Sequence, residues 1–244
     1  MPSTLNTNSA RPFAVFDIDG TLIRWQLYHA VADVLLKADT NTELYDSIRQ
    51  ARKKWKQRSH ATSFREYENA VVDAYESILK TLSVEEFNQA VDAVIDEHKD
   101  QVYTFTRDLI AELKEQGYFL LAISGSQTEL IKKIADYYDF DDFVGTDYTQ
   151  DSGRFTGQKI HGAAQKDAAL KEFIQKHNLT QAGSYAVGDS ESDIPMLAIV
   201  ENPIAFNPTK ALLETAQKQS WQVVVERKNV IYKLEKHNDS YLLA

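Results

Sequence analysis

The spacing of hydrophobic residues divides the chain into regions of different texture. Residues 1–12 are small and polar, which predicts a flexible N-terminal tail, and the apolar run 13–16 predicts a short buried strand. From residue 25 to residue 99, apolar residues recur every three or four positions with little glycine or proline, as in amphipathic helices. Four such stripes follow one another without an intervening strand. We therefore expect a helical bundle inserted after the first strand.

Further along, helical stripes alternate with short apolar runs. This alternation extends from residue 104 to about residue 225 and predicts a parallel sheet covered by helices. Asp151-Ser152-Gly153 lies between two runs with strand character and predicts a hairpin turn. Residues 226–244 are charged and mixed, and both a helix packed on the core and a loose tail fit this C-terminal extension.

Composition limits the kinds of function. The 244 residues include 27 Lys and Arg against 36 Asp and Glu, and the net charge of −9 disfavours a general grip on nucleic acid or anionic membrane. No run approaches the ~20 apolar residues that a membrane helix needs, and the N-terminus has no signal-peptide pattern. The absence of cysteine excludes disulfides and thiolate chemistry. We expect a cytoplasmic protein that binds neither nucleic acid nor membrane.

Polar residues follow three of the predicted strands at the point where each strand ends. Asp17-Ile18-Asp19-Gly20-Thr21 follows the first strand, Ser124-Gly125-Ser126 opens a later helix, and a third strand ends in residues 188–193. Each segment alone is also an ordinary turn sequence. In a parallel sheet, however, the carboxyl ends of the strands meet at one edge, where ligands bind. Carboxylates suit Mg²⁺, and hydroxyl groups, backbone N–H groups and Lys166 suit phosphate.

Taken in order, these segments resemble the four motifs of the haloacid dehalogenase (HAD) superfamily. The resemblance is closer to its phosphoserine-phosphatase-like branch, subfamily IB. It runs across the chain and implies an α/β fold, with a Rossmann-like three-layer core and a helical-bundle cap of the C1 type. The core would comprise residues 13–24 and 104–225, and the cap residues 25–103. The motifs are DIDGT (17–21), SGS (124–126), the lysine of QKDAAL (Lys166) and GDSESD (188–193).

The resemblance implies a Mg²⁺-dependent phosphatase that hydrolyses a small phosphorylated metabolite. Asp17 would be the nucleophile that forms an aspartyl-phosphate, and Asp19 would be the general acid and base. Asp17, Asp189 and the backbone carbonyl of Asp19 would hold Mg²⁺, with Asp193 either ligating the metal or orienting the ligands. The presence of Asp19 favours phosphate chemistry over cleavage of a carbon–halogen bond.

The same resemblance assigns the phosphate-binding residues. Ser124 and the Gly125 N–H would hold the phosphoryl group, and Lys166 would balance its charge during transfer. Gly20 and Thr21 would shape the loop that carries the first motif. On this interpretation, Ser124 and Lys166 are catalytic as well as substrate-binding residues.

The leaving group is less defined than the phosphate site. True phosphoserine phosphatases place a glutamate shortly after the first motif, where it meets the substrate ammonium, and by spacing this position is Gln26. A neutral amide cannot replace that charge, so a different small phosphomonoester is favoured over phosphoserine. Three residues would lie where the cap meets the core: Trp25, Gln26 and Tyr28. Their positions fit contact with the leaving group and packing of the cap equally well.

Three alternatives to this interpretation stay open. The protein could be a phosphoserine phosphatase proper, a phosphotransferase or phosphomutase that passes the phosphoryl group to an organic hydroxyl, or a non-catalytic protein that binds a phosphorylated ligand. Intact Asp17, Asp19, Lys166 and Asp189 argue against the last. A cluster of basic residues between residues 49 and 58 reads more readily as a solvated helix face than as a substrate contact. The sequence does not define the oligomeric state.

Overall fold

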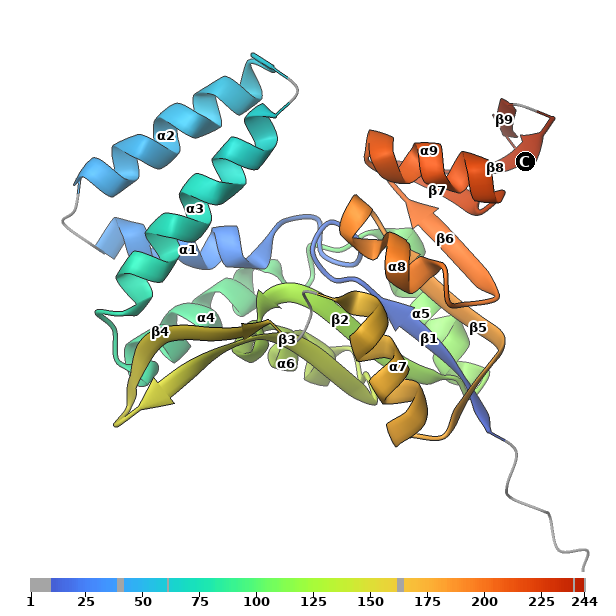
Figure 1. Cartoon of the computed structure of the whole chain (residues 1–244), viewed down its shortest axis with the longest axis horizontal. Coiled ribbons are helices and arrows are strands. Elements are labelled where there is room, and N and C mark those ends of the chain that lie inside the picture. Colours follow the sequence, from blue (N-terminus) through green and yellow to red (C-terminus); the bar gives the residue numbers. More distant parts are fainter. Residues whose placement is uncertain (1–9, 39–41, 61, 162–164, 239, 244) are drawn as a thin grey trace, which may run out of the picture.

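The computed structural model describes residues 10–38, 42–60, 62–161, 165–238 and 240–243 (Figure 1). Most of the expected N-terminal tail therefore lies outside the described residues, and the first strand begins at Arg11. The first elements are β1 (Arg11–Phe16), α1 (Leu27–Ala38), α2 (Thr42–Lys56), α3 (Ser63–Leu79), α4 (Val84–His98), α5 (Thr104–Glu115), β2 (Phe119–Gln127), α6 (Thr128–Tyr137), β3 (Asp142–Asp151) and β4 (Arg154–His161). They are followed by α7 (Lys166–Lys176), β5 (Leu179–Gly188), the 3₁₀ turn η1 (Glu191–Asp193), α8 (Ile194–Leu197), β6 (Asn202–Phe206), α9 (Lys210–Gln219), β7 (Gln222–Arg227), β8 (Val230–His237) and β9 (Ser240–Leu243).

The described strands form one sheet in the order β4-β3-β2-β1-β5-β6-β7-β8-β9. The six strands from β3 to β7 in this order pair in parallel, as the alternation of strands and helices predicts. The antiparallel hairpin of β3 and β4 turns at Ser152 and Gly153, both with positive φ, and this confirms the predicted turn. The expectation of an α/β fold with a mainly parallel sheet is confirmed.

Both faces of this sheet are covered, which explains why its central strands are continuously apolar. In β1, Phe13 and Val15 pack with α7, α8 and α9, whereas Ala14 and Phe16 pack with α5 and α6. All four side chains are fully buried. Successive side chains of a strand point to opposite faces, so one short run supplies both cores. The result is a three-layer arrangement of helices, sheet and helices (Figure 1).

Four helices, α1 to α4, lie between β1 and α5 in the sequence and extend the core on one face of the sheet. The chain leaves the sheet and returns to it through two adjacent segments. Ile23 forms an antiparallel bridge with Val102, and the Arg24 amide donates to the Gln101 carbonyl at 2.8 Å. The Arg24 guanidinium also donates to the Val102 carbonyl, at 2.6 Å. These bonds fix the point at which the helical insertion is attached.

Glu226 connects this attachment point to the far part of the sheet. It lies on β7, its side chain is 1% exposed, and its carboxylate accepts a hydrogen bond from Arg24. The same carboxylate accepts from the amides of Thr104, at 3.1 Å, and Phe105, at 2.8 Å, at the start of α5. A carboxylate at a helix N-terminus satisfies free N–H groups and interacts favourably with the helix dipole.

The expectation for residues 226–244 is wrong. Both a helix and a loose tail were compatible with the sequence, but the segment continues the sheet as the end of β7 and the antiparallel strands β8 and β9. The side chain of Tyr241 explains how this segment is held, because its hydroxyl donates to the carbonyls of Ala216 and Trp221, at 3.0 and 2.6 Å. Pairing with β7 satisfies the backbone groups that an edge strand would otherwise leave free.

Candidate active site

The predicted site residues lie at the carboxyl ends of β1, β2 and β5. In the sheet, β1 lies between β2 and β5, and the chain turns to opposite sides of β1 at this place. Open α/β sheets bind ligands at such a point. The structure brings Asp17 beside the end of β5, since the Asp17 amide donates to the Val187 carbonyl at 3.0 Å. Gly188 and Asp189 follow directly.

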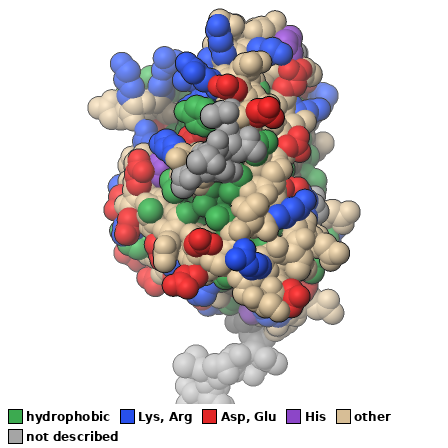
Figure 2. Space-filling view, turned by 90° about the vertical axis from the view of Figure 1, so that its left-hand side faces the viewer, with side chains coloured by type: hydrophobic (Ala, Val, Ile, Leu, Met, Phe, Trp, Pro, Cys, Tyr) green, Lys and Arg blue, Asp and Glu red, His purple; other side chains and the backbone are tan. Residues whose placement is uncertain are grey.

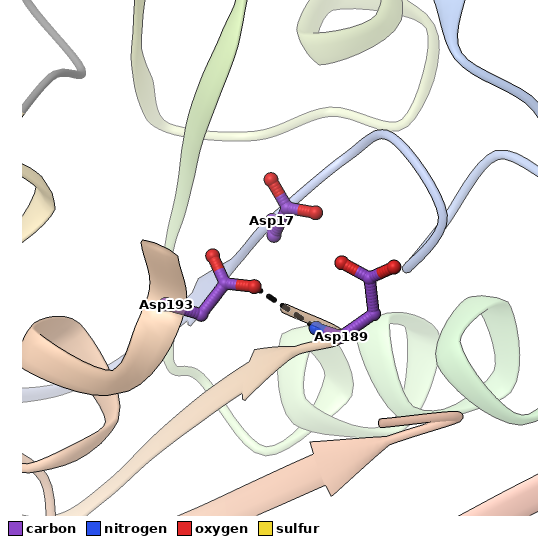
Figure 3. A group of neighbouring side chains, drawn as sticks. All are labelled: Asp17, Asp189 and Asp193. Atoms are coloured by element: carbon purple, nitrogen blue, oxygen red, sulfur yellow. Dashed lines mark hydrogen bonds between the residues drawn. The ribbon is translucent and has the colours of Figure 1, made fainter. Parts of the chain in front are cut away.

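Three aspartates form a compact acidic cluster there (Figure 3). Asp17, Asp189 and Asp193 each offer a carboxylate oxygen, and these oxygens lie within 4.8 Å of one another. Lys166, the first residue of α7, reaches into the cluster and is itself buried. Its Nζ lies 2.7 Å from Oδ1 of Asp17 and 2.5 Å from Oδ1 of Asp193. Three of the four motifs therefore meet in this cluster.

The cluster carries more negative charge than its lysine can balance. Burial raises the pKa of Asp17, and the Lys166 ammonium offsets only part of this increase. Burial also raises the pKa of Asp189, and the charge of Asp17 raises it further. Among the described residues, nothing donates a hydrogen bond to the Asp189 carboxylate. A divalent cation with oxygen ligands would supply the missing positive charge, so the residues fit Mg²⁺.

Asp193 differs from the other two because its oxygens are already engaged. Oδ2 accepts from the backbone amides of Asp189 and Ser190, at 3.0 and 2.9 Å, and from the Ser190 hydroxyl. Oδ1 faces Lys166. The dashed line in Figure 3 marks the bond to the Asp189 amide. This arrangement suits a residue that positions Asp189 and Lys166 better than one that binds metal through a free carboxylate.

The Asp19 side chain lies outside the acidic cluster and has different partners. Oδ1 accepts the amide N–H of Leu27, the first residue of α1, at 2.6 Å, and Oδ2 accepts the Ser124 hydroxyl at 2.8 Å. Burial raises the pKa of Asp19, although these hydrogen bonds lower it. A buried carboxyl group with a raised pKa at the edge of a cavity is suited to carry a proton.

The loop around the first motif is held close to the cluster. The Thr21 hydroxyl donates to Oδ2 of Asp17 at 3.0 Å. Gly20 has φ of +82°, and a Cβ there would lie 2.5 Å from Oδ2 of Asp189. Any larger residue would therefore be strained and would displace this carboxylate. The glycine is required by the approach of two motifs that are distant in the sequence.

The acidic cluster opens into a cavity of about 740 Å³. Asp17, Asp19, Lys166 and Asp189 line it, and Gly125 and Ser126 line it on the side of β2. Ser124 itself is fully buried and bonded to Asp19, so its hydroxyl is not among the described groups that line the cavity. Its oxygen also accepts the Ser126 amide at 3.0 Å, which holds the backbone on both sides of Gly125 near the end of β2.

The three residues predicted to lie beside the leaving group have different positions. Gln26 and Tyr28 line the cavity. Trp25 is not among the described residues that line it, and its ring instead meets the edge of buried His29 in the hydrophobic core. The Trp25 ring therefore packs within the helical insertion, whereas Gln26 faces the cavity.

Much of the cavity wall comes from residues that sequence patterns did not select. Tyr28 was noted, but the α3 residues Glu68 and Tyr75 were not, and neither were Gln127 and Tyr148. Tyr75 donates a hydrogen bond to the Gln127 side chain, and this contact joins α3 to β2 over the cavity. A second stripe on α3, beside its buried stripe, combines aromatic and apolar residues with Glu68 and is a signal that could have pointed to this wall.

The basic residues of α2 lie away from this site. Figure 2 shows Lys and Arg side chains along the upper part of the molecule, where α2 lies in Figure 1. None of the α2 residues is among the described residues that line the cavity of the acidic cluster. The expected solvated face is consistent with this position. In the described part of the chain, no helix is both long and apolar enough to cross a membrane.

Comparison with known proteins identifies the family. A model of the haloacid dehalogenase-like hydrolases matches residues 14–198, which contain all four motifs. The chain belongs to this family. The resemblance inferred from the motifs and the expected enzyme class, a phosphatase-type hydrolase of this family, are thereby confirmed.

Two curated relatives cover most of this chain. A histidinol-phosphatase from Neisseria meningitidis serogroup C is 24% identical over 226 residues, which are 86% of this chain and 97% of that protein. A phosphoserine phosphatase from Archaeoglobus fulgidus is 23% identical over 212 residues, again 86% of this chain but 56% of that protein.

Solved structures share the fold at low identity. A protein of unknown function from Bordetella pertussis Tohama I has a TM-score of 0.71 at 22% identity, over 88% of this chain and 98% of that one. A phosphoserine phosphatase, solved as an analogue of its phospho-aspartyl intermediate, has a TM-score of 0.61 at 20% identity. That match covers 91% of this chain and 96% of the other. These likenesses show that the fold is that of the family.

Proposed function

We propose that the protein hydrolyses a small phosphomonoester through an aspartyl-phosphate formed on Asp17. The position of Asp17 carries this proposal. Its carboxylate lines the cavity, lies 2.7 Å from the Lys166 ammonium and accepts the Thr21 hydroxyl. These two contacts, one to each carboxylate oxygen, orient the carboxylate toward the cavity and favour the ionised form that a nucleophile needs.

Asp19 is the proposed general acid and base. As the bond from phosphorus to Asp17 forms and the bond to the leaving oxygen breaks, Asp19 gives its proton to that oxygen. In the second step it takes a proton from the water that attacks the phosphoryl group, and Asp17 is released. The amide of Leu27 and the hydroxyl of Ser124 hold the Asp19 carboxyl group in place for both transfers.

Mg²⁺ is the proposed cofactor, held by Asp17, Asp189 and the backbone carbonyl of Asp19. The unpaired Asp189 carboxylate beside Asp17 supports this set of ligands. Asp193 would keep Asp189 and Lys166 in position. When bound, Mg²⁺ supplies positive charge that offsets the charge of the phosphoryl group. Lys166 and the Gly125 N–H would hold phosphoryl oxygens. Ser124 would keep the backbone around Gly125 in position through its hydrogen bond with the Ser126 amide.

Helices α1 to α4, within residues 25–103, are the proposed cap over a core of residues 13–24 and 104–225. Tyr28 on α1 and several residues of α3 line the same cavity as the catalytic aspartates, which supports this division. Such a cover excludes water from the first step. A small phosphorylated metabolite fits a cavity of about 740 Å³.

Hydrolysis of 4-nitrophenyl phosphate in the presence of Mg²⁺ tests this proposal. We expect turnover that excess EDTA abolishes and that Asp17→Asn lowers by a factor of ~10³ or more. Asp136→Asn, an exposed change on α6, is the matched control and should retain activity. Undiminished turnover in Asp17→Asn or in EDTA would contradict the mechanism. Products formed with added alcohols as acceptors distinguish hydrolysis from phosphoryl transfer.

Phosphoserine and histidinol phosphate are the first natural substrates to compare, because relatives that cover most of this chain carry those names. Gln26 stands at the position expected for an ammonium-binding glutamate, so we expect weak turnover of phosphoserine unless another carboxylate of the cavity meets its ammonium group. The four tyrosine and phenylalanine rings in the cavity lining favour a leaving group with an aromatic or apolar part. They are Tyr28, Phe64, Tyr75 and Tyr148.

A further inference from the structure

One wall of the cavity is a single stripe of α3. Its side chains recur every three or four residues, so they share one face of the helix. The adjacent face is buried against the rest of the helical insertion through Tyr67 and Val71. The stripe is therefore the part of α3 that a leaving group would meet. Its members are Phe64, Glu68, Val72 and Tyr75.

The charged groups that line the cavity are unevenly matched. Every described cation in the lining already has an acidic partner. Lys166 forms ion pairs within the acidic cluster, and each of the other lining cations forms an ion pair with a glutamate. The pairs are Lys166 with Asp17 and Asp193, Lys159 with Glu76, Arg65 with Glu191 at 3.7 Å, and Lys210 with Glu214 at 3.8 Å.

Two described lining carboxylates outside the acidic cluster have no partner among these cations: Asp19, which is held by the Leu27 amide and the Ser124 hydroxyl, and Glu68. No described ion pair includes Glu68, and its one described hydrogen bond comes from the Tyr28 hydroxyl at 3.5 Å, the outer limit for such a bond.

The Glu68 side chain is half-buried, and this burial raises the pKa of its carboxyl group. The Tyr28 hydrogen bond and the nearby charge of Arg65 lower this pKa in part, but the Arg65 guanidinium is itself paired with Glu191. An ionised carboxylate in such a place gains from a cationic partner.

We propose that Glu68 selects substrates whose leaving alcohol carries a cationic nitrogen, which the Glu68 carboxylate meets inside the cavity. The inference rests on the proposed function, because the alcohol must be part of a phosphomonoester bound at Asp17. The rings of Tyr28, Tyr75 and Tyr148 add to the same preference, since aromatic faces attract ammonium and imidazolium groups. Gln26, also in the lining, provides no charge for this purpose.

The test compares pairs of phosphomonoesters that differ in charge. Aminoalkyl phosphates with two to four carbons, and 2-(imidazol-4-yl)ethyl phosphate, are each matched with a neutral alkyl or aryl phosphate of similar size. The measured quantity is the ratio of kcat/KM for the cationic member to that for the neutral member. A charge-assisted hydrogen bond corresponds to a ratio of roughly tenfold to a hundredfold.

We expect the best cationic substrate to show that ratio with the wild-type protein and a ratio near one with Glu68→Gln. The change should appear mainly in the KM of the cationic substrate. Glu66→Gln is the matched control. Glu66 lies on the same helix but is exposed and is not among the described lining residues, so the wild-type ratio should persist.

Binding measurements separate this inference from the proposed function. Calorimetry with aminoalkyl phosphonates and their neutral counterparts gives the same preference without turnover. A ratio near one for every pair with the wild-type protein, or a high ratio that survives in Glu68→Gln, overturns the role of Glu68. Failure of the Asp17→Asn and EDTA tests with 4-nitrophenyl phosphate overturns the proposed function instead, and the binding preference then still reports on Glu68.

Discussion

Replacement of Glu226 by alanine tests the contacts that attach the helical insertion to the sheet. The side chain is 1% exposed, and its carboxylate accepts hydrogen bonds from Arg24 and from the amides of Thr104 and Phe105. Hydrogen bonds to charged groups contribute about 1.5–3 kcal/mol each, but they are not additive. Loss of one partner from a buried ion pair costs about 3–5 kcal/mol.

The Arg24 side chain is 37% exposed, so water compensates part of the loss. We therefore expect Glu226→Ala to lower the free energy of unfolding by about 3 kcal/mol. In a chain of this size, the melting temperature should fall by roughly 6–12 °C.

Differential scanning calorimetry at pH 7 measures this change. Glu226→Gln keeps a hydrogen-bond acceptor but removes the charge, and its melting temperature should lie between those of Glu226→Ala and the wild type. Glu115→Ala, which removes an exposed glutamate from the end of α5, should change the melting temperature by less than about 2 °C. If Glu226→Ala melted within 2 °C of the wild type, the three bonds would not stabilise the fold as reasoned.

Three further predictions follow from the site and its surroundings. Gly20→Ala should lose about 1–2 kcal/mol of stability through its positive φ. If Mg²⁺ is the cofactor as proposed, it should raise the melting temperature of the wild type but not of Gly20→Ala, because the new Cβ displaces Asp189. A normal Mg²⁺-dependent shift would count against this geometry. Lys166→Met leaves two buried carboxylates unpaired and should lower kcat on 4-nitrophenyl phosphate by a factor of ~10² or more; an unchanged kcat would show that the lysine is dispensable. Burial raises the pKa of Asp142, but hydrogen bonds from Lys176 and His177 outweigh it and hold this pKa below its usual value. Asp142 thus stabilises the fold above its unfolded pKa of ~3.9, and this contribution is lost as the pH falls through the lower folded value. Urea unfolding from pH 6 to pH 3 should show that Asp142→Asn is less stable at pH 6 and that its deficit shrinks in acid, whereas a constant deficit would contradict the linkage.

The meeting of the motifs at one edge of the sheet could be predicted from the sequence, because it follows from the order and direction of the strands. Once β1, β2 and β5 are parallel neighbours, their carboxyl ends lie at one edge whatever the rest of the fold does. Asp17 and Asp189 therefore meet even though 171 residues separate their positions. The same argument places Lys166, which begins the helix before β5.

The residues that form the cavity wall could not be predicted from the sequence, because they depend on how the helical insertion packs over the sheet. Periodicity identifies the buried stripe of α3 with Tyr67 and Val71. It does not say what the neighbouring stripe, which contains Glu68, faces. Glu68 and Tyr75 become part of the cavity only through the angle at which α3 lies. Trp25 shows the converse, since its proximity to the first motif suggested a ligand contact and its ring is used for packing.

The C-terminal strands escaped prediction for a different reason. Strands β8 and β9 pair antiparallel near the edge of the sheet, and much of their surface is exposed, so charged and apolar residues mix on both faces. Their position is determined by hydrogen bonds to β7, which a local pattern does not reveal. Glu226, just before them, reads as one more surface charge until its distant partners are known.

The bonds between Arg24 and residues 101–102 have a consequence for motion. Both crossings of the chain into the helical insertion are bonded to each other, and Glu226 anchors them to β7 and α5. The two crossings therefore cannot shift independently of each other. The insertion is bonded to the core at a second place, because Tyr75 of α3 donates to Gln127 of β2. Opening the cavity between α3 and the strand ends would require this bond to break, whereas Asp17, Lys166 and Asp189 all lie outside the insertion.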